Sequence, residues 1–304
     1  MHRPEMGTLL EHLTDELNNF EDIAKYLMPQ PGELPDVAGI DVFGGTLALN
    51  GSVGGDHIIY VDFKQRYDLQ ARINRAIDEG KPELVENLKR CQKMAGIVVI
   101  DVEGHQVTDA LLAAMMHQAF LLGSIYELDM FGHITKRLFE NLNTRFHKSS
   151  GERKFISMIY GEISDDAMFR FISAAQPLPA VFSRRYDRFM EVSQDLCVSF
   201  PPIGLLPSLH VTDRHTTNSV LGFKDHYQLN EWMLMGEGDV LLLHTDGLSE
   251  HATRTEAYFP DRLERTLSQV KERSAKEIFE AIKQDVLAFG KPSDDISVIV
   301  IKRK

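Results

Sequence analysis

The chain has 304 residues, of which 43% are hydrophobic, and this is enough for a sizeable core in one large domain or two modest ones. Its 45 acidic side chains outnumber the 33 basic ones, and the formal charge of -12 argues against non-specific binding to nucleic acid or anionic lipid. Cys91 and Cys197 are the only cysteines, and neither lies in a CxxC or Cys/His cluster, which argues against a disulfide scaffold and a structural zinc site.

The N-terminal segment is expected to be an amphipathic helix. Residues 8 to 28 carry apolar side chains at alternating spacings of three and four, as in a surface helix or a short coiled coil. These side chains are Leu10, Leu13, Leu17, Phe20, Ala24 and Leu27. Pro29, Pro31 and Gly32 end the pattern, so we separate residues 1–30 from a globular domain over 31–304. Two roles fit this helix: packing on its own domain, or forming a homodimer.

The sequence offers no signal for export or membrane insertion. We find no apolar run of the roughly 18 residues that a membrane span needs. The N-terminus, MHRPEMGTLLEHLTDEL, lacks the basic region and apolar block of a signal peptide. We therefore expect a cytoplasmic protein that has neither a membrane nor a nucleic acid as partner.

Two predicted strands and a helical insertion follow. The runs IDVFGGTLAL and HIIYVDF are typical of strands on either side of a polar turn. Residues 64–96 are charged and have helical periodicity, with Gly80-Lys81-Pro82 dividing them into two halves. The apolar face of the first half is Leu69, Ile73 and Ile77, and that of the second is Leu84, Leu88 and Cys91. This pattern predicts a solvated helical hairpin, or a site where a partner docks.

The stretch VVIDVEGHQVTDALLAAM, residues 98 to 115, joins an apolar strand to a helix that looks buried on every side. Asp101 stands where the strand ends, and a carboxylate fixed there is a candidate ligand. A second helix should pack beside the first, because apolar residues recur at helical spacing through Phe131, Ile134, Leu138, Leu142 and Phe146.

The remainder of the chain is predicted to be mainly strands. FISMIYGEIS and MFRFISAAQ are typical of a hairpin, and further strands are expected near 180–183 and 188–193. Helices near 256–272 and 275–289 precede the last strand, ISVIVI. Since strands and helices are grouped rather than alternating, the class is α+β with an antiparallel sheet.

Four acidic positions lie at strand ends. Asp101 and Asp246 follow their strands, whereas Asp56 and Asp294, with Asp295 beside it, precede theirs. If these strands are antiparallel, a start and an end share one edge, and the carboxylates can converge. Crowded carboxylates repel one another unless cations neutralise them, and ligands that are all oxygen favour Mg²⁺ or Mn²⁺. Two such ions can activate a shared water toward phosphorus, so the pattern predicts a phosphoester hydrolase.

At this point the sequence resembles the metal-dependent protein phosphatase (PPM) family, in its bacterial branch of stage II sporulation protein E and sigma-factor-regulator phosphatases. The matching motifs occur in the family's order over nearly the whole chain after residue 30. They are VGGD (53–56), IDVEGHQVTDALLAAM (100–115), SAAQPLPAV (173–181), PPIGL (201–205), GDVLLLHTDGLSE (238–250) and SDDISVIVI (293–301).

The resemblance implies a fold, a reaction and a set of ligands. The fold is two packed antiparallel sheets flanked by helices, an α-β-β-α sandwich, here with an N-terminal helix and the 64–96 insertion. The reaction is hydrolysis of phosphoserine or phosphothreonine on a regulatory protein, such as an anti-sigma-factor antagonist, by a water that bridges two Mn²⁺ or Mg²⁺ ions. Asp101 would bridge the ions with help from the Val102 carbonyl, Asp246 and Asp294 would hold one ion, and Asp56 would contact the second ion or its waters.

Three further features of the sequence each allow more than one interpretation. The family's customary Gly-His before the prolines is replaced by Ala175-Gln176, which affects loop shape rather than the metal ligands. His105 either gives a proton to the leaving serine or is only a hydrogen-bond partner of nearby acids. The basic run at 183–188 either gathers phosphate or forms a solvated hairpin tip.

Other functions fit parts of the pattern. A phosphoacceptor receiver domain also groups aspartates at strand ends, but its acidic pair follows the first strand, whereas Asp294-Asp295 precede the last one here. A catalytically silent module could keep the phosphatase fold and bind a signalling partner. Phosphorus chemistry on a small molecule is a third alternative.

Overall fold

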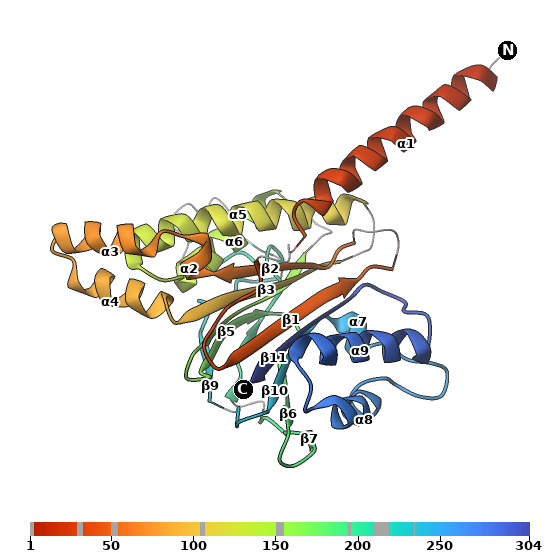
Figure 1. Ribbon diagram of the computed structural model, residues 1–304. Helices are drawn as coiled ribbons and strands as arrows, with labels where there is room; N and C mark the ends of the chain where they lie inside the picture. Colours follow the sequence, from red (N-terminus) through yellow and green to blue (C-terminus); the bar gives the residue numbers. More distant parts are fainter. Residues whose placement is uncertain are drawn as a thin grey trace.

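Two β-sheets lie face to face, and helices cover the outer face of each (Figure 1). The computed structural model describes residues 3–28, 33–49, 54–103, 107–149, 155–193, 196–209, 219, 221–233 and 235–304. The strands are β1 (Ile40–Leu47), β2 (His57–Asp62), β3 (Met94–Val102), β4 (Ile156–Ser164), β5 (Phe169–Ala174), β6 (Ala180–Ser183), β7 (Arg188–Phe189), β8 (Ser199–Phe200), β9 (Asn230–Trp232), β10 (Val240–His244) and β11 (Ile296–Arg303). The helices are α1 (Arg3–Lys25), α2 (Phe63–Arg66), α3 (Leu69–Asp78), α4 (Pro82–Cys91), α5 (Val107–Phe131), α6 (Lys136–Ser149), α7 (Asp246–Ser249), α8 (Asp261–Val270) and α9 (Ala275–Phe289). The predicted α-β-β-α sandwich is confirmed.

The sheets are almost entirely antiparallel. One has the strand order β1-β11-β10-β6-β7, and the other has the order β2-β3-β4-β5-β8, with β9 also paired to β5. The short pairing of β5 with β8 is parallel, which the sequence did not predict. Because neighbouring strands run in opposite directions, the last residue of one strand lies beside the first residue of the next. Acidic residues that follow one strand and precede its neighbour can therefore come together.

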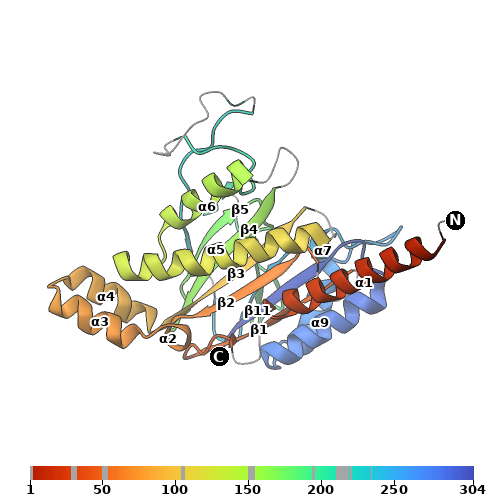
Figure 2. The same cartoon turned by 90° about the horizontal axis from the view of Figure 1, so that it is seen from above.

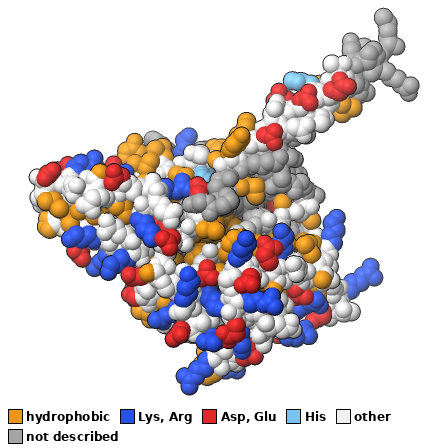
Figure 3. Space-filling model, viewed as in Figure 1, with side chains coloured by type: hydrophobic (Ala, Val, Ile, Leu, Met, Phe, Trp, Pro, Cys, Tyr) orange, Lys and Arg blue, Asp and Glu red, His pale blue; other side chains and the backbone are white. Residues whose placement is uncertain are grey.

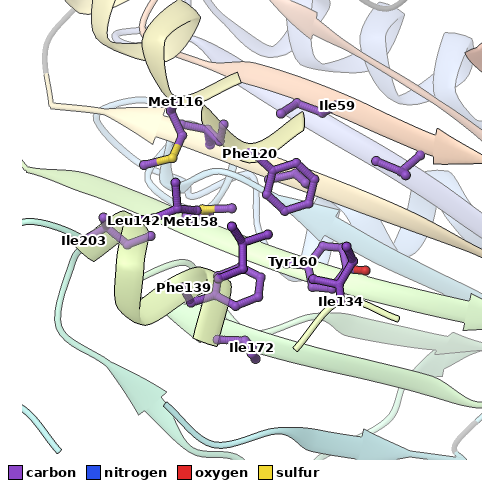
Figure 4. Packing of buried hydrophobic residues seen from close by; sticks show 14 of the residues in the cluster. Ile59, Met116, Phe120, Ile134, Phe139, Leu142, Met158, Tyr160, Ile172 and Ile203 are labelled. Atoms are coloured by element: carbon purple, nitrogen blue, oxygen red, sulfur yellow. The ribbon is translucent and has the colours of Figure 1, made fainter. Parts of the chain in front are cut away.

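Strand β3 shows why the apolar runs are continuous rather than alternating. Ile97 and Val99 face the other sheet, whereas Val98, Ile100 and Val102 face α5 and α6. Because both faces are covered, apolar side chains are favoured at every position. Figure 4 shows the outer layer, where Phe120 of α5 and Phe139 of α6 lie against Tyr160 of β4, with ring centroids 5.5 and 5.4 Å from the tyrosine.

The insertion between β2 and β3 is part of the core, and the prediction of a solvated hairpin was wrong in this respect. Ile73 and Leu88 are buried in the same cluster as the sheet residues. Ile77, predicted on the buried face, is 58% exposed, because the buried face of α3 follows the spacing 69, 73, 76. Asp129 of α5 pairs with arginines of α3 and holds the hairpin on that helix.

Helix α5 is not buried on every side, as its sequence suggested. One face packs on the sheet, but the other exposes Leu111, Met115, Leu122, Ile125, Tyr126 and Met130. Figure 3 shows hydrophobic side chains along the upper edge of the body, where α5 lies. Residues Asp109–Phe131 also have the length and hydropathy of a membrane span, which we did not expect from the apolar runs in the sequence. In the fold, 39% of an 18-residue window of this helix is buried.

Helix α1 extends beyond the body in both views (Figures 1 and 2). It contacts α5 and ends at Lys25, three residues before the predicted limit. Leu9, Leu10, Ile23 and Tyr26 are exposed. The side chains of Leu13, Leu17, Phe20 and Ala24, which make up most of the predicted stripe, lie outside the described residues.

The burial of α3 gives a direct test of the role of the insertion in stability. Ile73→Ala should lower the free energy of unfolding by about 2–5 kcal/mol, because it leaves a cavity between α3 and the sheet. Ile77→Ala, the same change on the exposed side of the same helix, should stay within about 0.5 kcal/mol of the wild type. Urea denaturation measures both values, and equal effects of the two variants would contradict this packing.

Candidate functional site

The register of the strands brings the acidic positions together. His57 pairs with Ile100, so Asp56 lies opposite the end of β3, where Asp101 stands. His244 pairs with Val298, so Asp246 lies beside the start of β11. The first pair belongs to one sheet and the second to the other. The site is therefore built where the same end of both sheets meets.

The hydroxyl of Thr245 joins the two sheets at this end. Its Oγ1 donates to Asp56 Oδ2 at 2.8 Å and accepts the backbone N–H of Ser297 at 3.0 Å. The Ser297 N–H occupies one of the two lone pairs of the oxygen, and the hydroxyl proton is directed to Asp56. Burial, and then the charge of Asp101, raise the pKa of Asp56 well above its usual range, and the bond from Thr245 opposes them.

Asp295 makes a second connection between the sheets. Its buried carboxylate accepts the backbone N–H groups of Leu49 at 2.6 Å and Gly55 at 2.8 Å. A Cβ at Gly54 would lie 1.8 Å from its Oδ2, and one at Gly247 would lie 2.0 Å from its backbone oxygen. Both glycines are required by this close approach. Asp294, by contrast, is exposed, so the two neighbouring aspartates have different tasks.

Asp101 is half-buried and is held by the strand beside it. Ser157 of β4 lies directly opposite in the register, and its Oγ is 3.2 Å from both the carboxylate Oδ2 and the backbone oxygen of Asp101. Burial raises the pKa of Asp101 to about 7, and the charges of Asp246, Asp294 and Asp295 add to the shift.

The other two predicted ligands flank Asp101. Val102 is buried, and its N–H donates to the backbone oxygen of Gly55 at 3.3 Å. Asp246 opens α7, and burial, with the charges of Glu250 and Asp294, raises the pKa of its carboxyl. Three carboxyl groups with raised pKa values therefore share one neighbourhood, and this excess of negative charge suits cations bound through oxygen.

The carboxylates lie at the common end of the two sheets, but they do not form a complete set of metal ligands by themselves. Among the residues that the structure describes, no three His, Cys, Asp or Glu side chains form a metal-binding group by themselves. Backbone oxygens and water would have to complete the coordination, which is the usual situation for Mg²⁺. His105, the predicted proton donor, and Gly104 lie outside the described residues.

The basic run at 183–188 lies away from the site. Phe182 pairs with Val240, so the β6–β7 hairpin is at the end of the sheet opposite Asp246. Arg184 pairs with Glu272, and Asp187 with Lys271. The run is a hairpin tip with its own ion pairs, as one of the two interpretations predicted, and it does not line the acidic site.

A family model described as Stage II sporulation protein E (SpoIIE) matches residues 92–304 of this sequence. The chain belongs to the SpoIIE family. No curated protein sequence matches it.

Solved structures with this fold include PP2C phosphatase domains. The RsbU and RsbW domains of Rv1364c from Mycobacterium tuberculosis are 18% identical, with a TM-score of 0.61, over 89% of this chain and 61% of that one. The PP2C domain and regulatory fragment of SpoIIE from Bacillus subtilis are 16% identical, with a TM-score of 0.58, over 86% and 63%. The SiaA-PP2C domain of Pseudomonas aeruginosa is 14% identical, with a TM-score of 0.62, over 97% and 99%. The chain thus covers about three fifths of the first two structures, and its fold is that of PP2C phosphatases.

The SpoIIE-family match begins after Asp56, so the place of Asp56 in the site rests on the strand register and on the bond from Thr245. Sequence reasoning missed Thr245, Ser157 and the bracing role of Asp295. A signal existed for Thr245, a hydroxyl residue directly before Asp246 at the end of a buried strand. Ser157 carried a weaker signal, as a polar residue within the apolar run of β4.

The raised pKa of Asp101 predicts how the stability of this SpoIIE-family chain depends on pH when EDTA removes divalent ions. Between the usual aspartate pKa of about 3.9 and the folded value of about 7, the folded chain keeps a proton that the unfolded chain has released. The contribution of Asp101 to stability is therefore lost as pH rises through this window. Asp101→Asn cannot ionise, so its stability relative to wild type should be greater at pH 8 than at pH 5.

Urea denaturation at the two pH values measures this difference. Asp78→Asn, at an exposed position of α3, is the matched control and should follow the wild type at both pH values. Parallel pH profiles for wild type and Asp101→Asn would contradict the assigned shift.

Proposed function

We propose that this chain is a metal-dependent protein phosphatase that hydrolyses phosphoserine or phosphothreonine on a regulatory protein. The observation that carries the proposal is the meeting of Asp56, Asp101 and Asp246 from two different sheets, each with a raised pKa. Membership of the SpoIIE family supports the same reaction class. Asp294 is exposed and Asp246 is partly exposed.

The proposed ligands are Asp56, Asp101, Asp246 and Asp294, with the backbone oxygen of Val102, for two Mn²⁺ or Mg²⁺ ions. When bound, such ions lower the pKa of a shared water and neutralise charge on the phosphoryl oxygens. The chain's own contribution is to hold the ligands in place. Thr245 fixes Asp56, Ser157 fixes Asp101, and we further propose that His105 donates the proton that the leaving serine needs.

The proposed substrate is a small phosphorylated signalling domain, such as an anti-sigma-factor antagonist. What supports this class is the family and the likeness in fold to the RsbU and SpoIIE domains. A cytoplasmic location would agree with such a substrate, and cell fractionation tests it. The rival function is a catalytically silent module, which the lack of a closed chelate among the described residues would also fit.

Asp246→Asn separates these functions. With Mn²⁺, the wild type should hydrolyse p-nitrophenyl phosphate and a phosphoserine protein, and EDTA should stop both reactions. Asp246→Asn should lose at least about 100-fold of the rate, because it removes a ligand and a charge from the site. Asp166→Asn, an exposed acid in the β4–β5 turn, is the control and should keep the wild-type rate.

Full activity in Asp246→Asn would sink the two-metal assignment. Mn²⁺ binding by a folded wild type without turnover of either substrate would favour the silent module. Turnover of p-nitrophenyl phosphate alone would point to a small-molecule substrate.

We also propose a homodimer through α1. The exposed apolar residues Leu9, Leu10 and Ile23 lie on a helix that extends from the body, and burial against a second copy would stabilise it. The double variant Leu10→Asp, Ile23→Asp should shift the chain from dimer to monomer in light scattering, whereas Glu11→Ala should not. A wild-type chain that is monomeric at high concentration would contradict this proposal.

An activating partner is proposed to dock at the insertion. A groove of about 400 Å³ lies between the start of α4 and the end of α5, and Leu84, Met130 and Phe131 are among its lining residues. Deleting residues 66–93 would unfold the chain because the insertion belongs to the core. Met130→Arg is a better test: basal hydrolysis should persist, while stimulation by the partner should be lost. Unchanged stimulation would exclude the groove.

A further inference from the structure

Gln176 is buried behind Asp101 without touching it. It follows β5 in the turn that leads to β6, and the residue is 4% exposed. The residue before it, Ala175, is exposed and has a φ of 60°, a left-handed conformation that is costly for a residue with a Cβ. The turn therefore directs the amide of Gln176 inward at an expense in backbone strain.

The amide of Gln176 reaches Asp101 through Ser157. Its Nε2 donates to Ser157 Oγ at 3.1 Å, and that hydroxyl lies 3.2 Å from the carboxylate of Asp101. A hydroxyl has one proton and two lone pairs. Because the amide N–H occupies one lone pair of Ser157, the serine proton is left for Asp101, whose carboxylate Oδ2 and backbone oxygen both lie 3.2 Å from the hydroxyl. The chain of donors is Gln176 to Ser157 to Asp101.

The carbonyl oxygen of the Gln176 amide lacks a hydrogen bond within the described part of the chain, so the orientation in which the N–H points to Ser157 is energetically unfavourable at the oxygen. The Oε1 of Gln176 is buried and has no hydrogen-bond partner among the described residues. A buried carbonyl oxygen without a hydrogen-bond partner destabilises the fold. If the amide were reversed, its oxygen would compete with the Asp101 carboxylate for the serine proton. The polar turn is thus arranged around the N–H group.

We propose that Gln176 is a positioning residue: by orienting the hydroxyl of Ser157, it holds the Asp101 carboxylate as a divalent-cation ligand. This inference rests on the proposed function for the identity of the ligand. A histidine ring N–H could make the same donation as the Gln176 amide. Groups that hold a metal ligand in this way are typically worth 10–100-fold in metal affinity.

The test is calorimetric titration of Mn²⁺ into the full chain after EDTA treatment and dialysis at pH 8, with circular dichroism to confirm folding. Gln176→Met keeps the length of the side chain but removes the donor, and it should weaken Mn²⁺ binding by about 10-fold or more. Gln176→His should restore most of the affinity. Gln65→Met is the matched control, because Gln65 also donates to an aspartate, Asp62, but at the far end of β2. It should bind Mn²⁺ like the wild type.

A double-mutant cycle distinguishes positioning from general loosening of the turn. Ser157→Ala should weaken Mn²⁺ binding by itself, and adding Gln176→Met should weaken it no further, because the route to Asp101 is already cut. Wild-type affinity in Gln176→Met, or additive effects of the two changes, would overturn the inference.

The cycle also separates this inference from the proposed function. A wild type that binds Mn²⁺ but hydrolyses no phosphoester, together with the coupled result, would overturn the function and support the positioning role. If the wild type is active and Gln176→Met binds Mn²⁺ with wild-type affinity, the proposed function is supported and the positioning role is overturned. A wild type that binds no Mn²⁺ would overturn both.

Discussion

The bond from the Thr245 hydroxyl to Asp56 connects the two sheets at the end where Asp101 and Asp246 also lie. Buried carboxylates repel one another, and without such connections the sheet ends would move apart. The carboxylate of Asp295 adds to this restraint by accepting backbone N–H groups of the segment before β2. Neutral donors and backbone groups thus hold the acidic side chains together. The repulsion and burial that these bonds do not offset appear as raised carboxyl pKa values.

The rest of the fold supplies the rigidity that this arrangement needs. Apolar layers above, between and below the sheets fix the strand register, and the register decides which residues face each other at the strand ends. A slip of one residue in β3 would turn Asp101 from the side facing the other sheet to the side facing α5. The site therefore depends on packing many residues away, including that of the insertion, whose α3 and α4 share the core of the outer layer.

Much of this could be predicted from the sequence because it follows from short-range patterns. The apolar runs indicated the strands, and the order in which acids precede or follow them indicated an antiparallel meeting point. Helix α5 was harder: its composition is apolar all round, and only the fold decides which face is covered. The fold likewise decides whether Ala76 or Ile77 of α3 is buried, since the spacings of both from Ile73 fit a helix.

The contacts that refine the site could not be predicted, because they join residues far apart in the chain. Nothing near Gln176 in the sequence indicates that its amide meets Ser157, and the different tasks of Asp294 and Asp295 depend on backbone groups of residues 49 and 55. The family resemblance predicted the ligand positions, whereas the structure identifies the groups that contact these residues.

The most direct measurement of the central claim is a crystal structure with Mn²⁺, in which anomalous scattering locates the ions without reference to any assumed ligand. We expect two peaks at the common end of the sheets, between Asp101 and Asp246, with Asp56 beside one of them. Mn²⁺ peaks confined to other acidic surfaces, with this end of the sheets empty, would contradict it.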